Sequence, residues 1–361
     1  MTKLDGYILR KFFKTFVFCL LMFTLIAVAV DSSEKTDDFV RTGLGTSEII
    51  TQYYTGFVPF IWGFLFPLIV FISVIFFTSR MAFRSEIIAI IASGVTYNRW
   101  LRPYLFGGAL ITIIFWFGNQ YGIPRANEIR ARFESKYLGK YDPEKNFASP
   151  YYYLRIDTDT YVGIKFYDTA SKAAGNFFLE RVRKNQVIYN LRAETIRWDS
   201  VKKNWFLTNV VERTINNNKE AIRHLPQMNM NFNFKPEELR RDYYLKDKLT
   251  TPQLSKYIQV EELRGTEGLN TFKVEKYRRT SIAASVFILT LIGALIAGRK
   301  IRGGSGLHLA IGIAISAIFI LSDRFSTVFA VKGDFPPLLA AWMPNIVFSF
   351  VAIYLYIKAP K

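Results

Sequence analysis

Six long apolar stretches divide this sequence, and they limit what the chain can fold into more than any other feature. They cover residues 12–30, 57–78, 104–121, 281–297, 307–321 and 338–357. A helix needs about 20 mainly apolar residues to cross the hydrocarbon core of a bilayer, and each stretch meets or approaches that length. The sequence therefore predicts a membrane protein with six transmembrane helices, three on each side of a polar insert.

The first apolar stretch could also be a secretory signal, because Lys3, Arg10, Lys11 and Lys14 precede it. It is longer than the ~7–15 apolar residues typical of a signal, and no small-x-small cleavage site comes before the acidic segment that begins at Asp31. We therefore expect this stretch to remain as the first transmembrane helix.

Lysines and arginines in the short loops predict the orientation, since such residues accumulate on the cytoplasmic side. One side of the predicted helices collects Lys3, Arg10, Lys11, Lys14, Arg80, Arg84, Arg99, Arg102, Arg299, Lys300, Arg302, Lys358 and Lys361. The other side holds only Lys35, Arg41, Arg324 and Lys332. We therefore expect both termini in the cytoplasm and the large insert outside.

The chain divides into three predicted parts: residues 1–121 with helices 1–3, residues 122–279 with the insert, and residues 280–361 with helices 4–6. From Ser149 the insert shows alternating runs rich in Tyr, Val and Ile, ended by turn segments, which are typical of antiparallel strands. Five or six such strands predict a sandwich or open roll. The alternation leaves open whether the inner face is a packed core or an apolar slot.

Composition narrows the possible functions. The formal net charge is +18, and the insert has a surplus of Lys and Arg. For a basic domain on the outer side of a membrane, an anionic lipid or the phosphate of a glycolipid is a natural partner, and nucleic acid is a poor one. A basic surface that merely lies near the lipid headgroups would explain the charge equally well. One cysteine excludes an internal disulfide, and two histidines make a histidine-based metal site or catalytic triad implausible.

A short amphipathic segment, "RSEIIAIIASGV", lies between the second and third apolar stretches and predicts a cytoplasmic helix at about residues 84–96. Its two expected faces are Ile87, Ile88, Ile91 and Val95 on one side and Glu86, Ala89 and Ser93 on the other. The small face would allow another protein to approach closely, whereas a helix that rests on lipid would explain the isoleucines as well. Glu86 is favoured by the helix dipole in either case.

Several segments resemble, in their order and spacing, the LptF/LptG permease family of the lipopolysaccharide-transport ABC exporter. They are "KLDGYILRKF", "RSEIIAIIASGV", "IPRANEIRARFE", "LRAETIRWDSVKKNWFL" and "FPPLLAAWMPNIVF". The N-terminal LD-x-Y pattern looks nearer to LptG than to LptF. The resemblance implies six transmembrane helices with an inserted periplasmic β-jelly-roll domain, in the inner membrane of a Gram-negative bacterium.

The resemblance also implies a function. The chain would be a non-catalytic permease subunit that extracts lipopolysaccharide from the inner membrane and passes it to a periplasmic bridge. Expected partners are an LptF-like permease, an LptB-like cytoplasmic ATPase dimer that binds the ATP and Mg, and LptC-like and LptA-like bridge proteins.

The family's functional positions map onto candidate residues of this chain. The coupling helix would present Arg84, Ser85, Glu86, Ala89, Ser93 and Gly94 to the ATPase. In the family, basic side chains beyond the first helix contact the glycolipid phosphates, which makes Lys35 and Arg41 candidate substrate residues. Asp323 and Arg324 are candidate gate residues because charges near the end of a membrane helix can be functional, although snorkelling to the interface is the commoner outcome. In the β domain, Phe178 and Phe232 are expected to face inward along the lipid path. Asp323 and Arg324 could pair with one another or with the charged residues after the first helix, and an ordinary polar collar explains Lys35 and Arg41 equally well.

Two other classes of function stay open. One is a scaffold or mechanotransmission protein that docks an ATPase without moving lipid. The other is a membrane-anchored enzyme. This class is less favoured because "GRKIRGGSG", the glycine-rich segment, lacks the spacing of a phosphate-binding loop. Neighbouring genes for a second permease and an ATPase would favour the exporter over the scaffold.

Overall fold

The computed structural model describes residues 3–138, 151–168, 171–184, 186–216, 219–232, 234, 236, 244–265, 268–299, 304–333 and 335–359. The chain forms two compact units. The first contains Met1–Phe133, Lys246–Leu254 and Asn270–Lys361, and the second contains Glu134–Leu245 and Ser255–Leu269. The first unit is helical, and the second is built on a β-sheet.

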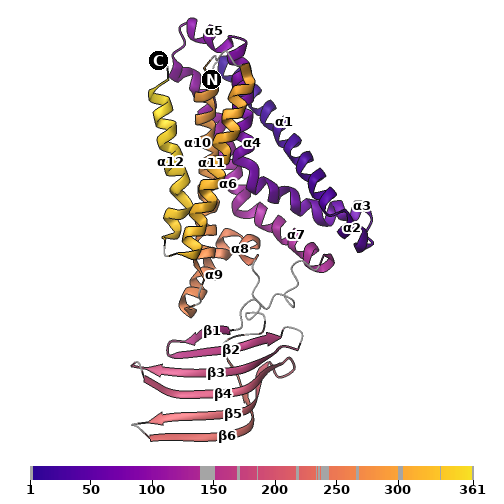
Figure 1. Cartoon of the computed structure of the whole chain (residues 1–361), viewed down its shortest axis with the longest axis vertical. Helices are drawn as coiled ribbons and strands as arrows, with labels where there is room; N and C mark the ends of the chain where they lie inside the picture. Colours follow the sequence, from indigo (N-terminus) through magenta and orange to yellow (C-terminus); the bar gives the residue numbers. More distant parts are fainter. Residues whose placement is uncertain are drawn as a thin grey trace. The chain divides into compact units, whose positions relative to one another are not determined.

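Six helical spans of the first unit are long and apolar enough to cross a membrane. Their main helices in Figure 1 are α1 (Lys3–Glu34), α4 (Thr55–Phe83), α6 (Tyr97–Phe117), α10 (Asn270–Ala297), α11 (Gly304–Lys332) and α12 (Pro337–Ile357). Two spans are extended through π-helical turns: η1 (Ile50–Tyr54) joins α3 (Thr46–Ile49) to α4, and η2 (Gly118–Gly122) joins α6 to α7 (Ile123–Tyr137). The expectation of a six-helix membrane protein is confirmed.

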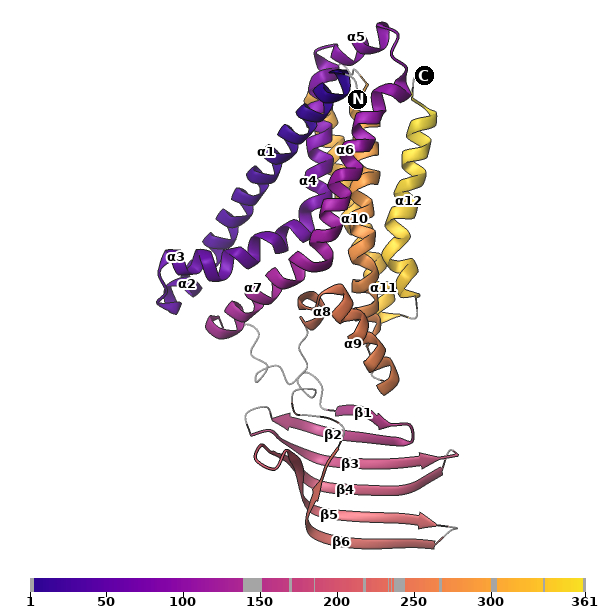
Figure 2. The same cartoon turned by 180° about the vertical axis from the view of Figure 1, so that it is seen from behind.

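Helix α10 is the centre of the bundle and α1 is its most peripheral span. In the apolar window of α10, 67% of the residues are buried inside the unit, against 11% for α1 and 22% for α11. The N-terminal half of α1 packs against the bundle through Phe12, and Gly107 of α6 makes this possible because a Cβ there would lie 2.7 Å from the Phe12 ring. Beyond Phe12, α1 diverges from α10 and α12 toward α2 (Thr36–Thr42), as both views show (Figures 1 and 2). It still contacts α4, because the Trp62 indole donates a hydrogen bond of 2.9 Å to the Thr24 hydroxyl.

Short helices lie at the two ends of this unit. Helix α5 (Glu86–Ala92) joins α4 to α6 at the end that carries both chain termini (Figure 1). At the opposite end lies α8 (Leu245–Lys248). The next helix in the chain is α9 (Thr251–Arg264), which from Ser255 onward belongs to the second unit. The main chain and hydroxyl of Thr250 donate hydrogen bonds of 2.9 and 2.7 Å to Gln253 Oε1. Thr250 is therefore the N-cap of α9.

The β unit contains one antiparallel sheet with the strand order β1-β2-β3-β4-β5-β6. The strands are β1 (Tyr151–Asp157), β2 (Thr160–Asp168), β3 (Ala173–Arg183), β4 (Gln186–Asp199), β5 (Asn204–Asn216) and β6 (Lys219–Met230). An all-β insert is thereby confirmed. Within the described residues the strands form a consecutive meander rather than the crossed order of a jelly roll, because short turns make each strand pair with the next.

One face of the sheet carries a packed core. Phe177, Trp205 and Leu207 are buried there, and Phe232 and Phe234, which follow β6, are buried against them. The Trp205 indole donates a hydrogen bond of 3.1 Å to the Phe234 carbonyl. In this structure the inner face is therefore closed by the chain's own aromatic residues rather than left as an open slot.

Candidate functional site

Helix α5 is held between two tight turns. Ser85, directly before it, has a φ of 62°, a left-handed conformation that costs a non-glycine residue roughly 1–2 kcal/mol. Gly94, after it, has a φ of 89°. Thr96 then caps α6 by accepting a hydrogen bond of 3.4 Å from the Arg99 main chain. These turns limit α5 to seven residues and separate it from the two flanking spans.

Most of the apolar side chains of α5 face outward. Ile87 is 2% exposed and packs into the bundle, whereas Ile88 is 52% and Ile91 37% exposed. The isoleucines expected on one face therefore do not share one environment, because Ile87 packs into the bundle together with the half-buried Ile90, while Ile88 and Ile91 are exposed. We define the α5 outer surface by its exposed residues Phe83, Arg84, Ile88, Ala89, Ile91, Ala92, Ser93 and Gly94.

The Glu86 carboxylate lies beside α1 and is bonded within the chain. Its Oε2 atom accepts hydrogen bonds from Lys11 Nζ at 2.7 Å and from the Tyr7 hydroxyl at 2.9 Å. Burial alone would raise the pKa of Glu86, but these two hydrogen bonds and the positive charge of Lys11 outweigh it and lower the pKa below its ordinary value. Glu86 therefore stays ionised at neutral pH and ties α5 to the first turns of α1.

A second ion pair reinforces this connection. Arg99 on α6 contacts Asp5 on α1 at 2.7 Å, and the Asp5 side chain is only 6% exposed. The first turns of α1 are thus bonded to both α5 and α6. A displacement of α5 would act directly on α1 through these contacts.

Lys35 is enclosed at the other end of α1. Its ammonium lies 2.7 Å from the Asp31 carboxylate, contacts the Tyr53 hydroxyl and lies 4.6 Å from the centre of the Tyr53 ring. The side chain is 15% exposed. Arg41, by contrast, is exposed in the last turn of α2. The two predicted substrate residues are therefore in different environments, and Lys35 would have to leave Asp31 to bind a ligand phosphate.

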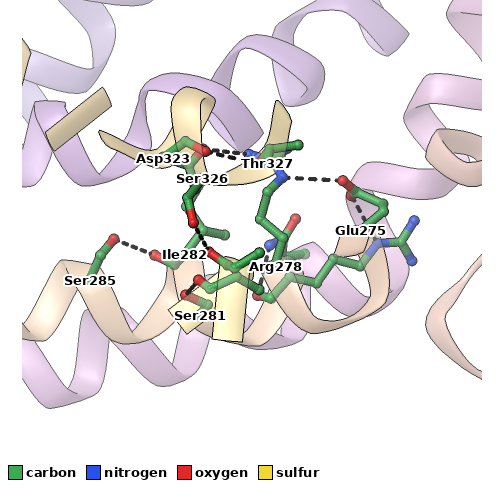
Figure 3. Close-up of polar contacts among 12 residues, drawn as sticks. Glu275, Arg278, Ser281, Ile282, Ser285, Asp323, Ser326 and Thr327 are labelled. Carbon is green, nitrogen blue, oxygen red and sulfur yellow. Dashed lines mark hydrogen bonds and ion pairs between the residues drawn. The ribbon is translucent and has the colours of Figure 1, made fainter. Parts of the chain in front are cut away.

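Asp323 and Arg324 do not pair with one another. Asp323 on α11 contacts Arg278 on α10 at 3.4 Å, and Arg278 also contacts Glu275 at 3.2 Å (Figure 3). The Arg324 guanidinium lies 4.7 Å from the Phe64 ring on α4. Glu275 and Arg278 were not predicted from the sequence. The signal was present, since ionisable residues near the start of an apolar helix need a partner.

Arg279 on α10 forms hydrogen bonds to the main chain in and directly after α8. Its guanidinium donates to the carbonyls of Lys246 and Leu249 at 2.7 and 2.8 Å and contacts Glu275 at 3.4 Å. The neighbouring Asp247 has a pKa raised to about 6, first by burial and then by the negative charge of Glu275. These groups form a compact, largely buried polar cluster, which we define as Asp247, Glu275, Arg278, Arg279 and Asp323.

The two β-domain candidates lie on opposite faces of the sheet. Phe232 belongs to the packed core, in ring contact with Phe177 at 5.3 Å. Phe178 covers Gly163 on the other face, where an added Cβ would lie 2.1 Å from its ring, and it contacts the exposed Tyr153. The inward placement of Phe178 is therefore wrong, because side chains alternate along a strand and Phe177 takes the inner position.

A family model described as "Lipopolysaccharide export system permease LptF/LptG" matches residues 6–358. The chain belongs to the LptF/LptG permease family. A comparison with curated proteins gave no match. The family match agrees with the observed order of three spans, a β domain and three spans.

Family membership identifies the chain as a lipopolysaccharide export permease, and the match does not distinguish LptF from LptG. Within the described residues no group of His, Cys, Asp and Glu side chains could hold a metal ion. The six apolar spans make this family member a multi-pass membrane protein.

Proposed function

We propose that this chain is the permease subunit of an ATP-driven exporter and that a separate cytoplasmic ATPase docks on the α5 outer surface. The observation that carries the proposal is the exposure of two apolar side chains between two membrane spans: Ile88 on α5 is 52% exposed, and Phe83, the last residue of α4, is 64% exposed. A protein that docks on such a helix and moves it would also displace the two flanking spans, α4 and α6. ATP and Mg would bind to the ATPase, and a homologous permease would complete the transporter.

Glu86, beside the α5 outer surface, would transmit the movement of α5 to α1. Its bonds to Lys11 and Tyr7 make α5 and α1 a mechanically connected pair. An ATPase side chain could compete for the carboxylate, which would release α1 when nucleotide binds. The apolar surface would then supply the docking energy, and Glu86 would supply the transmission.

The substrate would pass between α1 and α11. These two spans have the lowest buried fractions of the six, 11% and 22%, so they leave apolar surface for lipid or for a second permease. Arg41 and Arg324 are exposed and could bind the glycolipid phosphates by charge-assisted hydrogen bonds. Asp323 would act indirectly, by holding Arg278.

The β domain would receive the acyl chains and pass them to a periplasmic bridge of LptC-like and LptA-like proteins. Shielding is physically necessary because each CH₂ group exposed to water costs about 0.8 kcal/mol. In the present structure Phe232 and Phe234 close the inner face, so lipid passage requires these rings to move aside.

Substitution of the α5 outer surface tests the proposed docking. We expect Ile88→Asp to abolish co-purification of the ATPase, because a carboxylate would be buried in an apolar contact. Val201→Asp is the matched control, since Val201 is 91% exposed in a turn of the β domain. Retention of the ATPase by Ile88→Asp would overturn the docking proposal.

Glu86→Lys separates transmission from docking. We expect this variant to keep the ATPase bound but to lose export in proteoliposomes while hydrolysis continues, since the introduced ammonium group and that of Lys11 would repel one another. Normal export by the variant would remove Glu86 from the mechanism.

Crosslinking tests the path through the β domain. A photo-crosslinker at Phe232 should capture lipopolysaccharide only when ATP is present, whereas one at Phe178, on the opposite face, should capture little. Equal capture at the two positions, or capture at Phe232 without ATP, would contradict an ATP-driven inner path.

A further inference from the structure

A crevice opens between α6, α10 and α12, on a part of the bundle that the proposed function does not use. Its volume is about 410 Å³, within the ~300–1,000 Å³ typical of ligand sites. The apolar lining residues are Leu101, Leu105, Leu291, Ala352 and Ile353. The small side chain of Ala352, 4% exposed, forms part of the floor and leaves the space that a larger residue would fill.

The polar groups of the crevice gather at one end. They are Asn98 and Arg102 in the first turns of α6 and Tyr356 in the last turn of α12. The Tyr356 hydroxyl donates a hydrogen bond of 2.8 Å to Asn98 Oδ1, which leaves the NH₂ group of Asn98 as a donor. Arg102 adds a guanidinium with several further donors.

The charge of Arg102 is available to a ligand. Arg102 is exposed, and in the part of the chain that the structure describes no carboxylate is paired with it. The nearby arginines differ, because Arg99 is bonded to Asp5 at 2.7 Å and Arg299 donates to the Lys358 carbonyl at 2.6 Å. A positive, donor-rich group therefore borders an apolar crevice.

The polar and apolar lining residues of the crevice follow one another along the helix axis in the same order as the headgroup and acyl chains of a lipid. Arg102 lies five residues after the start of α6, about 7.5 Å along the helix axis. Leu105 and Ala352 lie deeper in the same crevice. The polar end is at the end of the bundle that carries both termini and α5 (Figure 1). In the orientation expected from the loop charges, this end faces the cytoplasmic leaflet, whose surface is negative.

We propose that this crevice binds one anionic phospholipid of the cytoplasmic leaflet. The phosphate accepts hydrogen bonds from Arg102 and Asn98, and one acyl chain lies along Leu101, Leu105, Ala352 and Ile353. The occupant is a lipid rather than a soluble anion because most of the lining is apolar. It is anionic rather than zwitterionic because the described lining residues include a cation but no carboxylate that would pair with a positive headgroup.

Native mass spectrometry of the purified full-length chain tests the site, with phosphatidylglycerol and phosphatidylcholine of identical acyl chains as probes. We expect phosphatidylglycerol to bind more tightly. Arg102→Gln should weaken its binding by about tenfold, as the loss of one charge-assisted hydrogen bond predicts. Arg10→Gln is the matched control, since Arg10 is exposed on α1 at the same end of the bundle and does not line the crevice.

A second variant addresses the apolar part of the crevice. Ala352→Phe should reduce the binding of both lipids, because the ring fills the crevice without altering its charge. Equal binding of the two lipids by the native chain, or equal effects of Arg102→Gln and Arg10→Gln, would overturn the proposal. A photo-crosslinker at Ile353 in native membranes should give an adduct with the mass of a diacyl lipid, and an adduct with a protein would show that a partner helix occupies the crevice instead.

Discussion

At the end of the helical unit that carries α5, the partly exposed Lys11–Glu86 ion pair joins α5 to α1, whereas at the opposite end a buried polar cluster joins the helices. The Lys11 and Glu86 side chains are 31% and 24% exposed, and they make one short contact. Arg279 is 3% exposed and bonds two main-chain carbonyls as well as Glu275. The first kind of contact can exchange partners with water or protein, but the second leaves charges buried when one member is lost.

This difference suggests a division between a movable and a fixed end. Exposed pairs contribute little net stability, so their rearrangement costs little. Buried, multiply bonded groups resist change because desolvated charges need every partner. The fixed end joins α8, α10 and α11, while the movable contact joins α1 and α5.

The largest expected effect is at the fixed end. Arg279→Met should lower the free energy of unfolding by about 3–5 kcal/mol, because it leaves Glu275 and two carbonyls short of donors. Thermal unfolding in detergent would measure the loss. Arg132→Met is the control, since its pair with Glu128 is 75% and 53% exposed and should contribute under ~1 kcal/mol. Similar losses in the two variants would remove the distinction between the ends.

An intermediate effect is expected at Asp247. Because its folded-state pKa is raised from 3.8 to about 6, the folded chain binds this proton more tightly than the unfolded chain does. Ionised Asp247 therefore destabilises the folded state; this destabilisation is fully present above pH 6 and is lost as the pH falls toward 4. Asp247→Asn should therefore stabilise the protein at pH 7.5, by an amount on the order of 1–3 kcal/mol, and less at pH 5.

Melting temperatures of both proteins at pH 7.5 and pH 5 would check this expectation. A variant that is less stable than the native chain at pH 7.5 would show that ionised Asp247 is needed by its arginine neighbours and that the fixed end tolerates no neutral group.

The smallest effect is expected at the movable end. A double-mutant cycle of Lys11→Met and Glu86→Gln should give a coupling energy of about 0.3–1 kcal/mol in thermal unfolding, because both groups are partly hydrated. A coupling above about 2 kcal/mol would mean that the α5 connection is as rigid as the buried cluster, and it would argue against partner exchange by Glu86.

Much of the fold could be predicted from local patterns. Apolar length located the six spans, and the alternation from Ser149 predicted five or six antiparallel strands, of which the structure has six between Tyr151 and Met230. The inner and outer positions were harder. Phe177 and Phe178 are adjacent aromatic residues, and only the pairing with Gly163 shows which of them faces the core.

The candidate sites were predicted less completely. The short α5 helix was expected, but its orientation about its own axis was not. The packing of Ile87 into the bundle sets that orientation and so decides which isoleucines are exposed. Arg278 and Arg279 were missed because their partners, Asp323 and the carbonyls of Lys246 and Leu249, are distant in the chain.

The sequence by itself determined that this chain crosses a membrane six times and carries a strand-rich insert, because burial in lipid and pairing in a sheet depend on runs of neighbouring residues. Only the tertiary structure decided that Glu86 meets Lys11 and that Asp323 meets Arg278. Such pairs depend on which helices pack together, and a charged side chain carries no local signal of the partner that will compensate it.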